Sequence, residues 1–158
     1  MSNVDFSKIT EEIYHVIEIE EKILTVQQND TITLKRNKQN RTIKQIIGHL
    51  SDSASNNHQR MVRLQYSKDL LFFPDYRQDN DLWIALQDYQ NEDWNNVIQL
   101  WQFFNLHIIQ VIKSVDQTKL DSYWCDFEGT KVTLQDMIEG YLSHLHLRIH
   151  EIHELMNT

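Results

Sequence analysis

Apolar residues recur at three- and four-residue steps in four long stretches of the chain, which is the pattern of helices that bury one face. The first stretch covers residues 7–28, the second runs from Thr42 to about Tyr66, the third covers residues 92–115, and the fourth begins at Thr133. A shorter helix is predicted over residues 81–89. Together these patterns predict an all-α four-helix bundle with a short extra helix between the second and third long helices.

Two of the predicted helices carry a start signal. Thr42 is followed three residues later by Gln45, and Thr133 is followed by Asp136. In both pairs the threonine hydroxyl and the later side chain can each satisfy a backbone N–H of the first turn. Segments 29–41 and 116–132 show little periodicity and are predicted to be loops, and segment 70–74 is predicted to be a hydrophobic loop.

Length and composition fit this prediction. The chain has 158 residues, which suits a single domain over residues 1–158. It contains 3 glycines and 1 proline. So few turn-forming residues disfavour a sheet protein with many tight turns and favour long helices joined by a few loops.

Charge narrows the classes of partner. The net charge is −8, from 15 basic and 23 acidic residues, so the chain lacks the basic surface that nucleic acids need. The chain has no basic amphipathic helix and no run of about 18 apolar residues, so the sequence does not suggest a membrane.

Cys125 is the single cysteine and cannot form an intrachain disulfide, so we expect a cytoplasmic protein. We also expect Cys125 to pack as a small apolar residue in a loop.

The chain contains eight histidines, and several lie on two predicted helices. Helical projection puts His49, Ser53, Asn56 and Arg60 on one flank of the second long helix, and Tyr141, His144, Arg148 and Glu151 on one flank of the fourth. His146, His150 and His153 share the opposite flank of the fourth helix. Histidines four residues apart can bind one metal ion, whereas a guanidinium has no lone pair to give. The alternative is a polar flank that happens to be rich in histidine.

Two further polar residues fall on predicted core stripes. Glu20 is either a partner for a site or a side chain that curls out to solvent. Asn105 is expected to bond a neighbouring helix or a site water, because an unpaired buried amide is costly.

Three stretches resemble proteins of the DinB/YfiT-like family. Residues 45–63, QIIGHLSDSASNNHQRMVR, resemble the family's second helix, in which a His-Leu-x-Asp-Ser context holds a metal-ligating histidine. The middle segment that begins FFPDYRQDNDLW and the last helix, VTLQDMIEGYLSHLHLRIHEI, resemble the corresponding family segments. Together they cover most of the chain from about Thr42 onward.

The resemblance implies a three-histidine site for a divalent metal of the Ni or Zn class. In the family's pattern His49 and His144 carry over as ligands, and the third ligand position is Arg148. A shift of two residues would pair His146 with His150 instead, but it would break the match at Tyr141. The residues implied to surround the site are Glu20, Ser53, Asn56, Asn105 and Tyr141.

Three hypotheses for function follow. The first is a non-catalytic relative without the metal, whose Arg148 binds a small anion or a partner, or pairs with Glu20 or Glu151. The second is a metal-dependent S-transferase or hydrolase that uses His49 and His144, with His58, Glu20 or a water as the third ligand. The third is a structural bundle with no pocket.

The resemblance also implies partners. We expect a small molecule, such as a low-molecular-weight thiol or an anion. We also expect a homodimer, for which an outward-projecting Leu147 is a mild hint.

Overall fold

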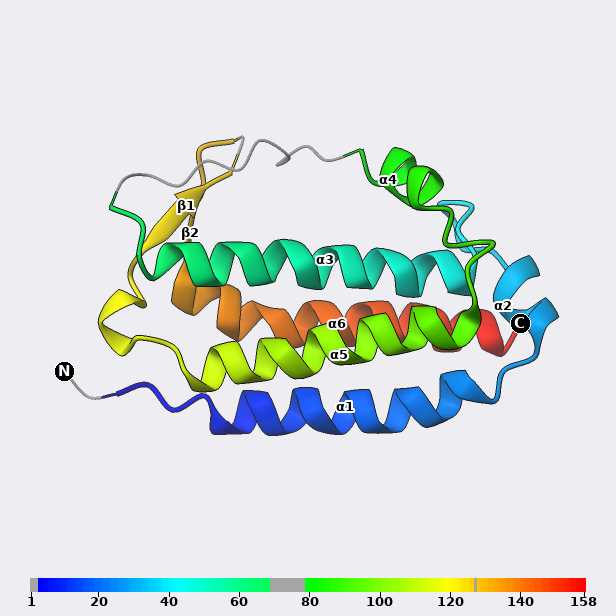
Figure 1. The fold of residues 1–158 in the computed structure, drawn as a ribbon, viewed down its shortest axis with the longest axis horizontal. Coiled ribbons are helices and arrows are strands. Elements are labelled where there is room, and N and C mark those ends of the chain that lie inside the picture. The colour runs from blue at the N-terminus through cyan, green and yellow to red at the C-terminus, as the bar shows by residue number, and fades with distance from the viewer. Residues whose placement is uncertain (1–2, 69–78, 127) are drawn as a thin grey trace.

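The computed structural model describes residues 3–68, 79–126 and 128–158, and its main body is a bundle of four long helices. These are α1 (Ser7–Thr25), α3 (Ile43–Leu64), α5 (Trp94–Lys113) and α6 (Leu134–Met156). Figure 1 shows that α1 and α6 point in one direction and that α3 and α5 point in the other. The consecutive long helices α3 and α5 are therefore parallel, which a simple up-and-down bundle does not allow.

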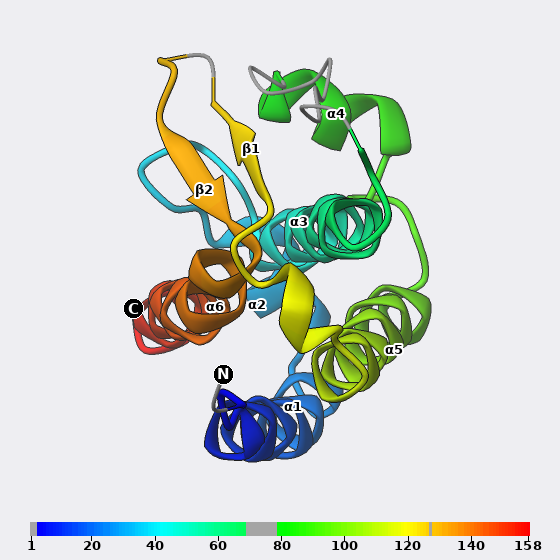
Figure 2. The ribbon, with the colours of Figure 1, turned by 90° about the vertical axis from the view of Figure 1, so that its left-hand side faces the viewer.

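The end-on view gives the order of the helices around the bundle. In Figure 2 the order is α1, α5, α3 and α6, and the most extensive contacts join α3 to α5 and α1 to α5. The fold class predicted from the hydrophobic pattern is confirmed, including the short extra helix, α4 (Asn80–Gln87).

Both predicted capping boxes are present. The backbone N–H of Gln45 donates to the Thr42 hydroxyl at 3.3 Å, and the backbone N–H of Thr42 donates to Oε1 of Gln45 at 3.0 Å. Thr133 and Asp136 make the same reciprocal pair at 3.0 Å and 2.9 Å. These bonds satisfy backbone donors in the first turns of α3 and α6, so they set where the two helices begin.

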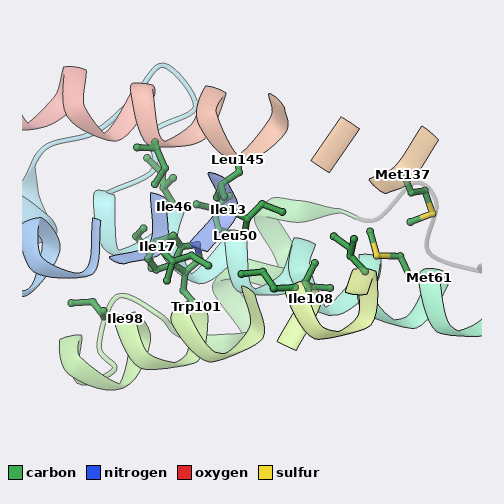
Figure 3. Packing of buried hydrophobic residues seen from close by; sticks show 14 of the residues in the cluster. Ile13, Ile17, Ile46, Leu50, Met61, Ile98, Trp101, Ile108, Met137 and Leu145 are labelled. Carbon is green, nitrogen blue, oxygen red and sulfur yellow. The ribbon is translucent and has the colours of Figure 1, made fainter. Parts of the chain in front are cut away.

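The interior of the bundle is apolar and is built from all four long helices. Figure 3 shows part of this cluster, in which Trp101 of α5 is completely buried. The core residues labelled there are Ile13, Ile17, Ile46, Leu50, Met61, Ile98, Trp101, Ile108, Met137 and Leu145. Burial of such side chains provides the main favourable free energy of folding.

Two segments predicted to be loops contain short regular elements. Segment 29–41 holds α2 (Asn29–Leu34), whose single buried residue is Ile32. Segment 116–132 holds a 3-10 turn (Gln117–Lys119) and the strand β1 (Tyr123–Cys125), which pairs in antiparallel fashion with β2 (Lys131–Thr133). Cys125 thus lies half-buried in a strand rather than in a loop. These elements are too short to produce a detectable period.

The hairpin stands beside the bundle near α3 and α6, and α4 lies over another part of α3 (Figures 1 and 2). Segment 70–74, predicted to be a hydrophobic loop, lies outside the described residues. Within the described part of the chain, no helix combines the length and apolar character needed to cross a bilayer.

Candidate ligand-binding site

A cavity of about 330 Å³ opens between α3, α5, α6 and the hairpin. Its apolar lining includes Leu50, Trp101, Met137 and Leu145, which Figure 3 labels. Its polar lining includes Ser53, Asn57, Arg60, Asn105, Asp136, Tyr141 and His144. An apolar cavity of this size with a few convergent polar groups is typical of small-molecule sites. The presence of this cavity also argues against the hypothesis of a purely structural bundle with no pocket.

A buried amide and a phenol form one wall of the cavity. The Tyr141 hydroxyl donates to Oδ1 of Asn105 at 2.8 Å, and Nδ2 of Asn105 donates to the carbonyl of Trp101 at 2.8 Å. Asn105 is therefore bonded to a neighbouring helix, as expected from its position on the core stripe. Burial raises the pKa of Tyr141, so its hydroxyl stays protonated and remains a donor.

The hairpin supplies an aromatic wall at one end of the cavity. The guanidinium carbon of Arg60 lies 4.3 Å from the ring centroid of Trp124. This separation is within the range of a cation–π contact, which orients a cation over the face of an indole. Arg60 is thereby held at the end of the cavity that the hairpin covers.

His49, His144 and Arg148, the three residues at the predicted metal position, are linked by electrostatic effects on the two histidines. Burial lowers the pKa of His49 to about 4, and the charges of Arg41 and Arg148 act in the same direction. His144 adds a smaller effect on His49. His144 is exposed overall, and partial desolvation of its ring on the cavity side, followed by the charge of Arg148, lowers its pKa. Both imidazoles are therefore neutral at pH 7. Of the three residues, His144 lines the cavity, whereas His49 and Arg148 are not among the lining residues.

Arg148 is held in place by an acidic neighbour on its own helix. Its Nη1 donates to Oε2 of Glu151 at 3.1 Å, and Oε1 of Glu151 accepts from Nδ2 of Asn37 at 2.6 Å. Glu151, rather than Glu20, is thus the partner of Arg148. Two buried nitrogens, Nε of Arg148 and Nδ1 of His49, have no hydrogen-bond partner among the described residues.

The other predicted site residues are spread more widely. Ser53 lines the cavity, whereas Asn56 is half-buried on α3 and is not among the lining residues. Glu20 is 5% exposed on α1, and its Oε2 lies 2.7 Å from Nε2 of His153. It is therefore neither curled toward solvent nor brought to His49 and His144. His58 packs against His107 of α5 instead of joining the predicted ligands.

Trp124 and Val132 line the cavity but were not predicted to do so. Both belong to the hairpin, in a segment predicted to be a loop. The sequence pattern that could have predicted the hairpin is a pair of three-residue runs, Tyr-Trp-Cys and Lys-Val-Thr, on either side of Gly129. Gly129 has a positive φ of 81°, which favours glycine in a turn.

The side chains at the predicted metal position do not fit a three-ligand centre. Within residues 3–68, 79–126 and 128–158, no group of three or more His, Cys, Asp or Glu side chains could hold a metal ion. Arg148 cannot supply the missing ligand because a guanidinium has no lone pair, and its positive charge repels a divalent cation.

Comparison with known structures identifies the architecture. No protein-family model matches the sequence, and no curated protein matches it. YfiT from Bacillus subtilis, described as a probable metal-dependent hydrolase with an unusual four-helix bundle topology, superposes with a TM-score of 0.85. The chain has the DinB/YfiT-like fold. The alignment covers 99% of this chain and 89% of YfiT at 18% identity.

A second structure shares the DinB/YfiT-like fold. The mycothiol-dependent maleylpyruvate isomerase superposes with a TM-score of 0.66 at 11% identity. The match covers 96% of this chain but 60% of the isomerase. At these identities the two structures establish the fold, and the chemistry of the cavity has to be argued from its own residues.

Proposed function

We propose that this chain binds a small organic anion in the cavity between α3 and α6, and that it does so without the three-ligand metal centre implied by the family. One observation carries the proposal: His144 lines the cavity, and the positive charge of Arg148 acts on both His144 and His49. A permanent cation beside two neutral imidazoles attracts an anion and repels a divalent metal.

The placement of the cations favours an anion of some length. Arg148 lies near His49 toward one end of the α3–α6 edge, and Arg60 lies on Trp124 at the hairpin end. His49 and Arg60 are eleven residues apart on α3, and at 1.5 Å per residue this separates them by roughly 16 Å along the helix. Although the overall charge of the protein is −8, each end of the α3–α6 edge therefore has a cation that can attract an anion.

The cavity lining beside Arg60 and His144 suits an apolar body. Leu50, Trp101, Met137 and Leu145 provide apolar surface, and the Tyr141–Asn105 pair provides a fixed polar wall. We therefore expect an organic acid with an apolar portion rather than a bare inorganic ion.

A fluorescence titration of tag-free protein with 8-anilinonaphthalene-1-sulfonate tests this proposal, because the probe joins a sulfonate to an apolar body. We expect either Arg148→Gln or Arg60→Gln, whichever arginine holds the sulfonate, to weaken binding by about tenfold or more, as expected when a charge-assisted hydrogen bond is lost. Arg63→Gln, at an exposed position of α3, is the matched control and should bind like the parent. Equal affinity in all four proteins would contradict the proposal.

A second function is favoured by the protonation of the histidines. The lowered pKa values of His49 and His144 leave each with a free lone pair at neutral pH, as a metal ligand requires. A metal-dependent hydrolase or thiol S-transferase would then use these two ligands, with a water or a substrate thiolate as the third. Stoichiometric metal in tag-free protein that is lost in His144→Ala would favour this function over anion binding.

The cytoplasmic location and the homodimer stay predictions. Leu147 is 62% exposed, as its projection predicts.

A further inference from the structure

Two histidines that do not line the cavity meet where α3 contacts α5. His58 of α3 and His107 of α5 lie with their ring centroids 5.1 Å apart and their planes at 64°. His58 is half-buried and His107 is exposed, and neither lines the cavity. The two rings are thus in contact with each other and within reach of solvent.

We propose that His58 and His107 together bind one divalent ion of borderline softness, such as Zn²⁺, Cu²⁺ or Ni²⁺, at a second site separate from the cavity. Imidazole nitrogens are good ligands for these ions. Two nitrogens at about 2.0–2.1 Å from one tetrahedral ion lie roughly 3.4 Å apart. Rings whose centroids are 5.1 Å apart can reach that nitrogen separation by small side-chain rotations.

The helices that carry the two histidines hold them at a fixed spacing. α3 and α5 run parallel and pack closely (Figure 1). Met61 follows His58 by three residues and is completely buried, and Ile108, next to His107, is also completely buried. Because these neighbours anchor the backbone beneath both rings, little ordering is needed when an ion binds.

The protonation of His58 also suits metal binding. Burial lowers the pKa of His58, and the nearby His107 lowers it further. His58 is therefore neutral at pH 7 and offers a lone pair. Among the described residues no third His, Cys, Asp or Glu completes the group, so water fills the other positions and the affinity is below that of a three-ligand site.

His146 and His150 are the rival pair, since they lie four residues apart on α6. Both are exposed, and they make no ring contact of this kind within the described part of the chain. His150 instead approaches Oε1 of Glu154 at 3.5 Å, where both side chains are largely exposed. An ion would have to order two free side chains there, which costs conformational entropy.

Calorimetric titration of tag-free protein with Zn²⁺ tests the proposal. We expect one ion per chain with micromolar affinity, and at least about a tenfold weaker affinity in His58→Ala and in His107→Ala. The double variant His146→Ala/His150→Ala is the matched control and should keep the parent's affinity. Zn²⁺ should also raise the melting temperature of the parent and the control, but not that of the His58 and His107 variants.

Three results would overturn the second site: no Zn²⁺ binding by the parent, unchanged binding in the His58 and His107 variants, or loss of binding in the control. If His144→Ala removes the binding instead, the ion lies in the cavity and the proposal is wrong. Circular dichroism checks that each variant is folded. His107 is exposed, so its variant remains informative if His58→Ala unfolds. Anion binding in the cavity can fail or succeed independently of these results.

Discussion

Tyr141 of α6 donates its hydroxyl hydrogen to Oδ1 of Asn105 of α5 at 2.8 Å, and the bond joins two helices at the wall of the cavity. Asn105 is 1% exposed, so its oxygen depends on Tyr141 as its side-chain donor. The same contact therefore shapes the cavity and stabilises the bundle.

Tyr141→Phe removes the donor and leaves the Asn105 oxygen buried without it. We expect the free energy of unfolding to fall by about 1–3 kcal/mol, the usual cost of an unsatisfied buried acceptor. Urea denaturation measures the change. Tyr14→Phe, at a 50% exposed position of α1, is the control and should leave stability unchanged. Equal stability of parent and Tyr141→Phe would show that the bond does not hold the wall.

Gly48→Ala should destabilise the bundle because a Cβ at this position would overlap the ring of Tyr89. The ring cannot move freely, since the Tyr89 hydroxyl donates to Oδ1 of Asp52 at 2.7 Å. Overpacking of this kind costs about 1–3 kcal/mol, offset in part by the better helix propensity of alanine. Gly140→Ala, on α6 with open space around it, should instead stabilise by up to about 1 kcal/mol. Thermal unfolding of both variants should show shifts of opposite sign.

The pair formed by Glu20 and His153 should matter more than the exposed pair formed by His150 and Glu154. His153→Ala leaves the buried Glu20 carboxylate without its 2.7 Å partner, and we expect a loss of about 1–3 kcal/mol in unfolding free energy. His150→Ala breaks an exposed pair and should change stability by less than about 0.5 kcal/mol. Denaturant titration of both variants makes the comparison, and equal losses would be evidence against a structural role for Glu20.

The pH dependence of stability should reveal the lowered pKa of the half-buried His49. Its pKa in the folded chain is lowered to about 4 from the ordinary 6.5, so the unfolded chain binds more protons between these values. The free energy of unfolding therefore rises with pH across that window and levels off above it. His144 and His58 act in the same direction.

His49→Gln should reduce the rise in stability between about pH 5 and about pH 7.5, measured by urea denaturation at each pH. Carboxylates that titrate in the same pH range affect the parent and the variant alike, so the difference between the two proteins reports the contribution of His49. An identical pH dependence in the two proteins would mean that His49 is not desolvated.

The long helices could be predicted because their signals are local. The reciprocal bonds of Thr42 with Gln45 and of Thr133 with Asp136 involve residues three apart, so they are visible without knowledge of the fold. The hairpin could not be predicted in this way. Its pairing of Tyr123 with Thr133 joins three-residue strands, too short to show alternation, and depends on contacts across a turn.

The candidate site was predictable to the extent that it lies on single helix faces. Projection predicts His49 on one flank of α3 and His144 and Arg148 on one flank of α6. The helices α3 and α6 pack against each other, and His144 lines the cavity beside them. The contact between His58 and His107 needs the parallel arrangement of α3 and α5, which no local pattern indicates.

We propose that Arg148, at a predicted ligand position, turns a metal site into an anion site. Zinc titration of His58→Ala/His107→Ala protein, with Arg148 or with Arg148→His, tests it while the proposed second site is absent. We expect no tight binding with Arg148, and stoichiometric binding with the histidine variant, which completes three ligands with His49 and His144. Tight binding in the presence of Arg148, lost on His144→Ala, would contradict the account.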